Sequence, residues 1–84
     1  MIDFEKFFIG EVGIIVKSLE EAVSLIDTCE EEGITVDCEA GDYEYYPYWY
    51  VEHGVLNITG DHLEELEHVD KFYTYQTYAF DNQN

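Results

Sequence analysis

Arginine is absent from this chain of 84 residues, and its basic side chains apart from histidine are Lys6, Lys17 and Lys71. Proteins bind DNA and RNA by neutralising phosphates with Lys and Arg, so direct nucleic-acid binding is disfavoured. Twenty aspartates and glutamates bring the formal net charge to −17, which an anionic lipid surface would repel. No apolar run reaches the roughly 18 residues of a transmembrane helix, and we therefore expect no membrane association.

Cysteine is also scarce, with Cys29 and Cys38 alone. Small secreted domains normally carry several disulfides, and the first residues lack the basic and apolar regions of a signal peptide. We therefore expect a reducing, cytoplasmic setting. The two thiols do not form a C-x-x-C pair that would bind zinc. Residues 37–42 have some features of a calcium loop, but their glycine is fifth rather than sixth, so no metal or other cofactor is expected.

Catalytic motifs are absent as well. The chain contains no G-x-S-x-G, no H-E-x-x-H and no glycine-rich phosphate-binding loop. Carboxylate pairs, which perform acid–base catalysis in many enzymes, are so numerous here that no single pair stands out. We therefore expect that the protein is not an enzyme.

Hydrophobic residues, in contrast, are plentiful. They make up 46% of the chain, and aromatic residues make up 17%, whereas disordered acidic segments have few of either. No linker or repeat interrupts the chain, and its length suffices for one small core. We therefore expect a single domain over residues 1–84, with a frayed tail at residues 81–84.

The clearest local signal is a helix that begins at Ser18. Ser18 and Glu21 match a capping box, in which the two side chains satisfy backbone N–H groups at the helix start, and Gly33 permits a left-handed stop. The spacing of apolar residues predicts a buried face made of Leu19, Ala22, Val23, Ile26 and Cys29. The opposite face is acidic or polar and consists of Glu20, Ser24, Asp27, Thr28 and Glu31.

Strands are predicted before and after this helix. Residues 7–16 and residues 34–38 are rich in β-branched residues or alternate in polarity. Residues 48–52 and 55–59 are expected to pair as a hairpin whose turn contains His53 and Gly54, because glycine permits the positive φ of a tight turn. The intervening residues 39–47 are expected to form a polar loop.

The last part of the chain is expected to contain a short helix, capped by Asp61 and extending through Val69, followed by a strand over residues 72–80. This strand is almost uncharged, so its edge is open to a second copy and permits a homodimer. The predicted order is β-α-β-β-β-short α-β. It corresponds to an α+β fold with one antiparallel or mixed sheet of about four to five strands and one main helix on one face.

Three groups of carboxylates are candidates for contact with a basic partner. They lie on the main helix, on the following strand and loop, and near the short helix. They are Glu20, Asp27, Glu30 and Glu31; Asp37, Glu39, Asp42 and Glu44; and Asp61, Glu64, Glu65 and Glu67. Aromatic residues interleave with the second group, and such side chains are enriched at interface hot spots. Tyr45 and Trp49 are therefore also predicted contact residues.

The run from Glu30 to Glu32 lies at the predicted C-terminal end of the main helix. The helix macrodipole is negative there, so carboxylates are unfavourable by a few tenths of a kcal/mol each. Helix stability alone would favour lysine at these positions. The local cost therefore favours a role for this acidity in binding.

Three segments resemble small proteins carried by bacteriophages: Ile15 to Ala22 (IVKSLEEA), Glu31 to Ile34 (EEGI) and His53 to Leu56 (HGVL). The likeness spans roughly residues 12–60. In size and charge the chain is also similar to phage-encoded inhibitors, including anti-CRISPR proteins, the uracil-DNA glycosylase inhibitor and restriction inhibitors, several of which imitate DNA. That similarity is one of kind, so it assigns no binding residue to this chain.

The sequence thus favours a phage-encoded inhibitor with an acidic, DNA-mimicking surface. Its partner would be a basic nucleic-acid-binding protein of the host bacterial cytoplasm, such as a CRISPR effector or another defence or DNA-processing protein, and long-range attraction would speed their encounter. Two alternatives stay open. One is a protein-interaction module with a Tyr/Trp-rich surface, acting as an allosteric inhibitor or dimer disruptor. The other is a cation-binding or halophilic domain.

Overall fold

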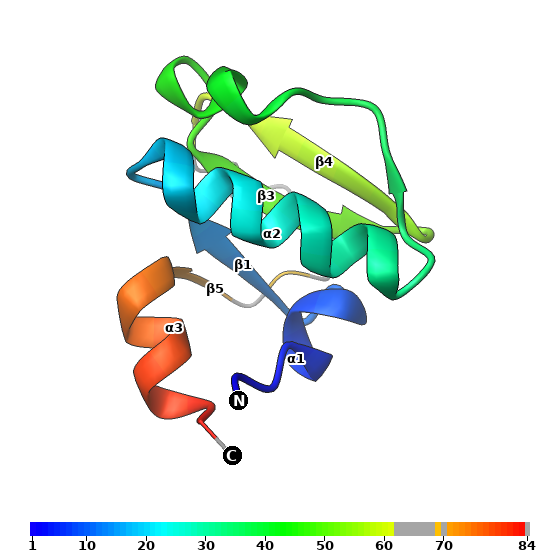
Figure 1. The fold of residues 1–84 in the computed structure, drawn as a ribbon, viewed down its shortest axis with the longest axis vertical. Coiled ribbons are helices and arrows are strands. Elements are labelled where there is room, and N and C mark those ends of the chain that lie inside the picture. Colours follow the sequence, from blue (N-terminus) through cyan, green and yellow to red (C-terminus); the bar gives the residue numbers. More distant parts are fainter. Residues whose placement is uncertain (62–68, 70, 84) are drawn as a thin grey trace.

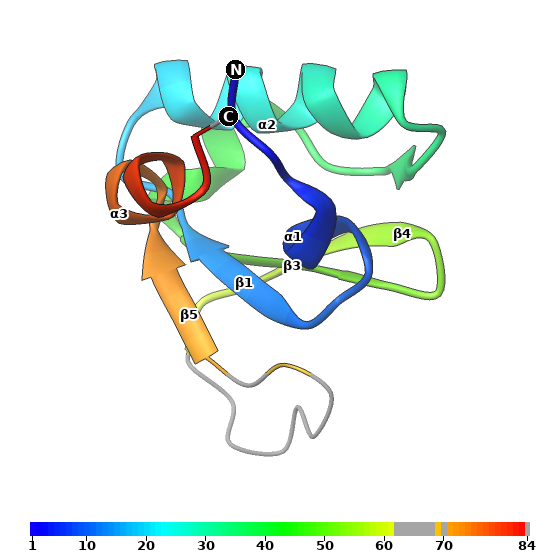
Figure 2. The same cartoon turned by 90° about the horizontal axis from the view of Figure 1, so that it is seen from below.

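The fold is a two-layer α+β arrangement in which one main helix lies along one face of a mixed five-stranded sheet (Figures 1 and 2). The computed structural model describes residues 1–61, 69 and 71–83. Its elements in chain order are α1 (Glu5–Phe8), β1 (Val12–Ile15), α2 (Leu19–Glu31), β2 (Thr35–Val36), the 3-10 helix η1 (Ala40–Glu44), β3 (Tyr48–Glu52), β4 (Val55–Thr59), β5 (Lys71–Thr74) and α3 (Tyr75–Asp81). The predicted fold class is confirmed.

The strands follow the order β2-β4-β3-β1-β5 across the sheet. β3 is antiparallel to both of its neighbours, β1 and β4, whereas β5 is parallel to β1 and β2 is parallel to β4. α2 connects β1 to β2, which lies at the opposite edge of the sheet from β5. The helix therefore covers the sheet between these strands, and its outer side is turned away from the core (Figure 2).

The start and the end of α2 confirm the predicted signals. Ser18 Oγ accepts a hydrogen bond from the backbone N–H of Glu21 at 3.2 Å, and Glu21 Oε1 accepts one from the N–H of Lys17 at 3.0 Å. Gly33 follows the helix with a φ of 85°, a value that favours glycine because it has no Cβ.

The buried face of α2 differs from the predicted one. Ala22, Leu25 and Cys29 are fully buried, whereas Leu19 and Val23 are 53% and 44% exposed. Both sets satisfy the helical spacing of an apolar stripe. The position of the sheet beneath the helix selects the stripe centred on Leu25, so the prediction that Leu19 and Val23 are buried is wrong.

The β3–β4 hairpin has the predicted residues and turn. Trp49 pairs with Ile58 and Glu52 with Val55, and the turn residues His53 and Gly54 have φ values of 54° and 74°. Two consecutive positive φ values match the twist of a two-residue hairpin turn.

The N-terminal segment is not one strand over residues 7–16, as predicted. Residues Glu5–Phe8 form α1, Gly10 reverses the chain with a φ of 81°, and only Val12–Ile15 joins the sheet. The reason is aromatic packing, because the helical turn buries Phe4 and Phe7 together. The ring of Phe4 stacks on Tyr78 with centroids 5.5 Å apart.

The C-terminal segment is likewise not one strand over residues 72–80. β5 ends at Thr74, whose Oγ1 accepts a hydrogen bond from the N–H of Thr77 at 3.2 Å and caps α3. The helix turns Tyr78 into the core, where its hydroxyl donates to the carbonyl of Asp3 at 2.9 Å. The edge proposed for a homodimer is therefore reduced to the four residues of β5.

Asn82 and Gln83, which belong to the tail predicted to fray, pair with the N-terminal segment. The N–H of Asp3 donates to the carbonyl of Asn82 at 2.8 Å, and Gln83 forms an antiparallel bridge with Ile2. The two ends of the chain accordingly lie close together (Figures 1 and 2).

Three further predictions concern the middle of the chain. The strand over residues 34–38 is shorter, since β2 contains two residues, although its alternation is retained, with Ile34 buried and Thr35 exposed. The polar loop over residues 39–47 contains η1. Most of the short helix predicted from Asp61 through Val69 falls on residues 62–68, which lie outside the described residues, and Val69 itself is buried and not helical.

Candidate functional site

The outer side of α2 carries the first group of predicted contact residues. Glu20, Asp27, Glu30 and Glu31 are all exposed. Within the part of the chain that the structure describes, none of these carboxylates accepts a hydrogen bond or forms an ion pair. A helix of 13 residues extends about 20 Å. α2 therefore presents a long row of charges that have no partner among residues 1–61, 69 and 71–83.

The second group lies on the segment from β2 through η1. Asp37, Glu39 and Glu44 are exposed, and no hydrogen bond of the Asp37 or Glu44 carboxylate is found among the described residues, whereas Glu39 and Asp42 form a capping box at the start of η1. Asp42 differs, because its Oδ2 accepts a hydrogen bond from the N–H of Glu39 at 3.0 Å. Asp42 therefore stabilises the start of η1 in addition to contributing charge.

These two groups adjoin one another. The segment between β2 and η1 runs alongside α2 (Figure 1), and η1 packs against the helix. We call their eight carboxylates the α2–η1 acidic surface. It consists of Glu20, Asp27, Glu30, Glu31, Asp37, Glu39, Asp42 and Glu44.

The pKa values of the two cysteines depend on the carboxylates where the two groups adjoin. The pKa of Cys29 is raised from 9.0 to about 12, chiefly by burial and then by the neighbouring Cys38 and Glu30. The pKa of Cys38 is also raised, chiefly by burial and then by the carboxylate of Asp42, with a smaller contribution from Asp37. Carboxylates from both groups thus act on the same pair of thiols, which supports a single continuous surface.

No lysine of the described part of the chain forms an ion pair with the α2–η1 acidic surface. An ion pair outside this surface joins His53 to Glu52, with 3.6 Å between Nε2 and Oε1. The ammonium group of Lys71 instead lies 5.1 Å from the ring centroid of Tyr73.

The two aromatic contact residues have opposite environments. Tyr45 is 75% exposed at the end of η1 and is accessible to a partner. Trp49 is fully buried, and its Nε1 donates to the carbonyl of Tyr46 at 2.7 Å. Trp49 is therefore a core residue, and its prediction as a contact residue is wrong because strand β3 turns this side chain toward α2.

The third predicted group is mostly outside the described residues. Asp61 is exposed after β4, whereas Glu64, Glu65 and Glu67 belong to the segment that the structure leaves undescribed. Among the described residues, no three His, Cys, Asp or Glu side chains are placed to hold a metal ion. Nor is any helix of this part of the chain both long and apolar enough to cross a membrane.

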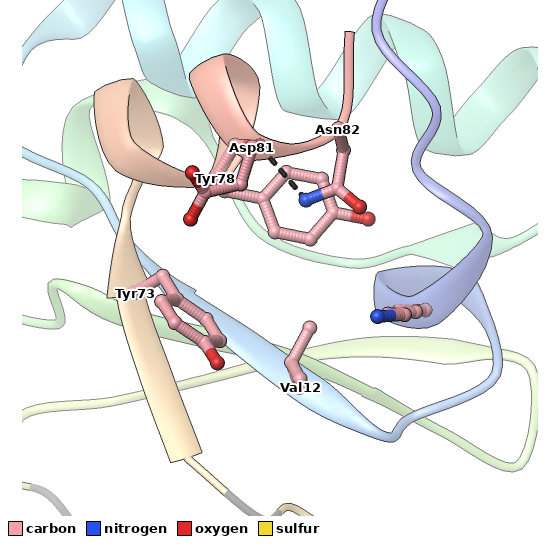
Figure 3. A pocket seen from close by; sticks show the side chains of 6 residues that line it. Val12, Tyr73, Tyr78, Asp81 and Asn82 are labelled. Atoms are coloured by element: carbon pink, nitrogen blue, oxygen red, sulfur yellow. Dashed lines mark hydrogen bonds between the residues drawn. The ribbon is translucent and has the colours of Figure 1, made fainter. Parts of the chain in front are cut away.

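A cavity of about 140 Å³ lies among α1, β1, β5 and α3 (Figure 3). Its lining residues are Lys6, Val12, Tyr73, Tyr78, Asp81 and Asn82. Asn82 closes one side, where its Nδ2 donates to the carbonyl of Tyr78 at 2.9 Å. Pockets for drug-sized ligands are typically about 300–1,000 Å³, so this cavity is smaller than such a site, and no predicted contact residue lines it.

The acidic residues in the last turn of α2 should lower the free energy of unfolding by an amount that can be measured. This turn contains Glu30 and Glu31 but no basic residue. We expect Glu31→Lys to raise the free energy of unfolding by about 0.3–1 kcal/mol, because a cation is favourable at the negative end of the helix. Glu20→Lys, in the first turn, should lower it by a similar amount. Urea denaturation of both variants checks these opposite signs, and equal shifts in one direction would contradict the account.

The raised pKa of Cys29 makes stability depend on alkaline pH. Between pH 9 and pH 12 the thiol ionises in the unfolded chain but stays protonated in the fold. Its contribution to stability is therefore complete below pH 9 and is lost as the pH rises toward 12. We expect the free energy of unfolding to fall more steeply above pH 9 in the wild type than in Cys29→Ala. Urea titrations at several pH values measure the two slopes, and equal slopes would contradict the expectation.

The structure thus defines an α+β protein with an acidic surface on its main helix and the adjoining 3-10 segment. No protein-family model, curated protein or solved structure matches this chain.

Proposed function

We propose that this chain is an inhibitor of the kind that bacteriophages encode, which binds a basic nucleic-acid-binding protein through the α2–η1 acidic surface. The partner would be a defence or DNA-processing protein of the bacterial cytoplasm, for example a CRISPR effector. Binding would cover the partner's nucleic-acid site and exclude DNA or RNA by competition. The role is binding rather than catalysis.

One observation carries this proposal: among the described residues, most carboxylates of the α2–η1 acidic surface accept no hydrogen bond from the fold. Glu21 and Asp42 accept hydrogen bonds from backbone N–H groups and so stabilise a helix start. Glu20, Asp27 and Glu31 accept no such bond within the described ranges, and Glu31 lies where a carboxylate is unfavourable. A partner with Lys and Arg side chains would supply the missing interactions.

Electrostatics also explains how such an inhibitor would compete with DNA. Like charges spread over a molecule with a radius of gyration of 11.4 Å produce a field that attracts cationic clefts and raises the association rate. Along α2, Asp27 and Glu31 are one helical turn apart, about 6 Å along the axis. Successive phosphates of one DNA strand advance about 3.4 Å along its axis and lie farther apart through space, so carboxylates at helical spacing can occupy phosphate sites.

Competitive capture tests this proposal. The chain is immobilised and exposed to nuclease-treated bacterial lysate in 50 mM salt, and retained proteins are eluted with double-stranded DNA. We expect DNA to release basic proteins that bind DNA, and 500 mM NaCl to release the same proteins because salt screens the interaction. Retained proteins that neither DNA nor salt releases would contradict the proposal.

A second candidate function rests on the exposed tyrosines. Tyr45 and Tyr46 are 75% and 48% exposed at the end of η1, and tyrosine is enriched at interface hot spots. In this alternative the chain acts through these rings as an allosteric inhibitor or dimer disruptor. Tyr45→Ser would then weaken binding more than Glu31→Lys does, and binding would change little between 50 mM and 500 mM salt.

A further inference from the structure

Two apolar side chains on the outer side of α2 are exposed beside its carboxylates. Leu19 and Val23 are 53% and 44% exposed, and neither belongs to the buried core cluster. Residues four apart lie next to one another on a helix surface, about 5–6 Å between Cβ atoms. Leu19 and Val23 therefore form one continuous apolar ridge, unlike the single exposed apolar residues that are common on protein surfaces.

The same ridge continues along α2 with acidic residues. Further steps of four residues from Val23 lead to Asp27 and then to Glu31, both exposed. The ridge is thus apolar at its first two positions and acidic at its last two. On one side it is bordered by Ser24, whose Oγ lies 2.8 Å from the hydroxyl of Tyr75 in α3. On the other side η1 packs against α2.

We propose that this ridge binds a cationic amphipathic helix of the partner, with apolar side chains against Leu19 and Val23 and Lys or Arg side chains against Asp27 and Glu31. This inference rests on the proposed function and specifies the partner segment. Ridges made by residues four apart pack into the grooves of another helix, which favours a helical partner. Charge complementarity determines which end of the partner helix carries the cations, because the ridge has acidic residues at one end and carries no cation.

The charge of the ridge disfavours other occupants. A second copy of this chain would bring like charges together at the acidic end, which is costly when they are desolvated. An anionic membrane would repel the same carboxylates. A helix with apolar residues on one turn, followed by cationic residues, complements both the apolar half and the acidic half of the ridge.

A synthetic peptide tests the proposal directly. The probe is a helical peptide with two leucines four residues apart, followed by three lysines over the next two turns. It is titrated into the ¹⁵N-labelled chain in 50 mM salt. We expect shifts confined to α2 and its neighbours. A peptide of the same composition, with its leucines moved to the opposite helical face, should bind at least about 10-fold more weakly; equal binding of the two peptides would overturn the proposal.

Variants separate this inference from the proposed function. Leu19→Ser combined with Val23→Ser should weaken the peptide by at least about 10-fold. The matched control is Ile9→Ser with Phe80→Ser, which removes two apolar side chains that are 63% and 78% exposed outside α2 and should leave binding unchanged.

Parallel measurements with a DNA-binding protein from the capture experiment give distinct outcomes. If the Leu19 and Val23 substitutions have no effect but Asp27→Lys with Glu31→Lys removes binding, the acidic surface is supported and the apolar ridge is refuted. If neither pair of substitutions changes binding, both proposals fail.

Discussion

A variant with Glu20→Lys, Asp27→Lys and Glu31→Lys should lose at least about 100-fold in affinity for a basic DNA-binding partner, equivalent to about 2.7 kcal/mol. The three side chains are exposed on α2 and have no hydrogen-bond partner among the described residues. Each substitution replaces an attractive charge with a repulsive one. Titration calorimetry of variant and wild type, at the same salt concentration, measures the difference.

The fold of this variant should be preserved. Lysine is unfavourable at position 20, in the first turn, and favourable at position 31, in the last turn, so the two dipole effects largely cancel. We expect the free energy of unfolding to change by less than about 1 kcal/mol. The matched control reverses Glu5, Glu11 and Asp81, which are exposed outside the α2–η1 acidic surface. An equal loss of affinity in that control would show that net charge, and not this surface, determines binding.

Gly13→Ala should destabilise the fold by about 2–3 kcal/mol, a typical cost of overpacking. A Cβ at Gly13 would overlap the ring of Phe72, which lies beside it because Gly13 pairs with Phe72 in the parallel β1–β5 ladder. The ring also makes edge contacts with Tyr48 and Tyr50, at centroid distances of 5.3 and 6.4 Å. Moving it would disturb both contacts. Thermal denaturation should show a melting temperature lower by about 10 °C or more.

Two further variants identify the cause of this loss. Gly41→Ala should leave the melting temperature nearly unchanged, because a Cβ there meets no atom within 4 Å. In a Phe72→Ala background, Gly13→Ala should cost far less than it does in the wild type, since the overlapping ring is gone. An undiminished cost in that background would mean that Phe72 is not the reason for glycine at position 13.

Local sequence signals predicted the elements whose causes are local. The Ser18–Glu21 cap and the His53–Gly54 turn involve residues a few positions apart, and the structure contains α2 and the β3–β4 hairpin at these places. The prediction of a strand over residues 72–80 was wrong because the conformation of this segment depends on contacts with residues far away in the sequence. Tyr78 lies in a helix where it stacks on Phe4 and bonds to the carbonyl of Asp3, and both partners are more than 70 residues away in the sequence.

The candidate site was predicted in part. Every predicted acidic residue of α2 and of the β2–η1 segment is at the surface or partly exposed, because charged side chains are rarely buried without a partner. The exposure of Leu19 and Val23 was missed. Their spacing fits a buried stripe as well as that of Leu25 does, and only the position of the sheet distinguishes the two. Trp49 was misassigned for the same reason, since strand alternation does not by itself identify the face that α2 covers.

The carboxylates of this chain are of two kinds. Glu21 and Asp42 satisfy backbone N–H groups, so their charges contribute to folding. Glu20, Asp27 and Glu31 have no such role among the described residues, and Glu31 opposes the helix macrodipole. Substitutions of the first kind should change stability, whereas substitutions of the second kind should change binding.

Displacement of DNA tests the central claim most directly. A fluorescent DNA duplex is bound to a DNA-binding protein from the capture experiment, and the chain is added while the anisotropy of the duplex is followed in 50 mM salt. We expect the anisotropy to fall to the value of free DNA as the chain saturates the partner. The variant with Glu20→Lys, Asp27→Lys and Glu31→Lys should displace far less DNA. An anisotropy that stays constant or rises while the chain binds would mean that DNA and chain occupy the partner together, and would contradict competition for one site.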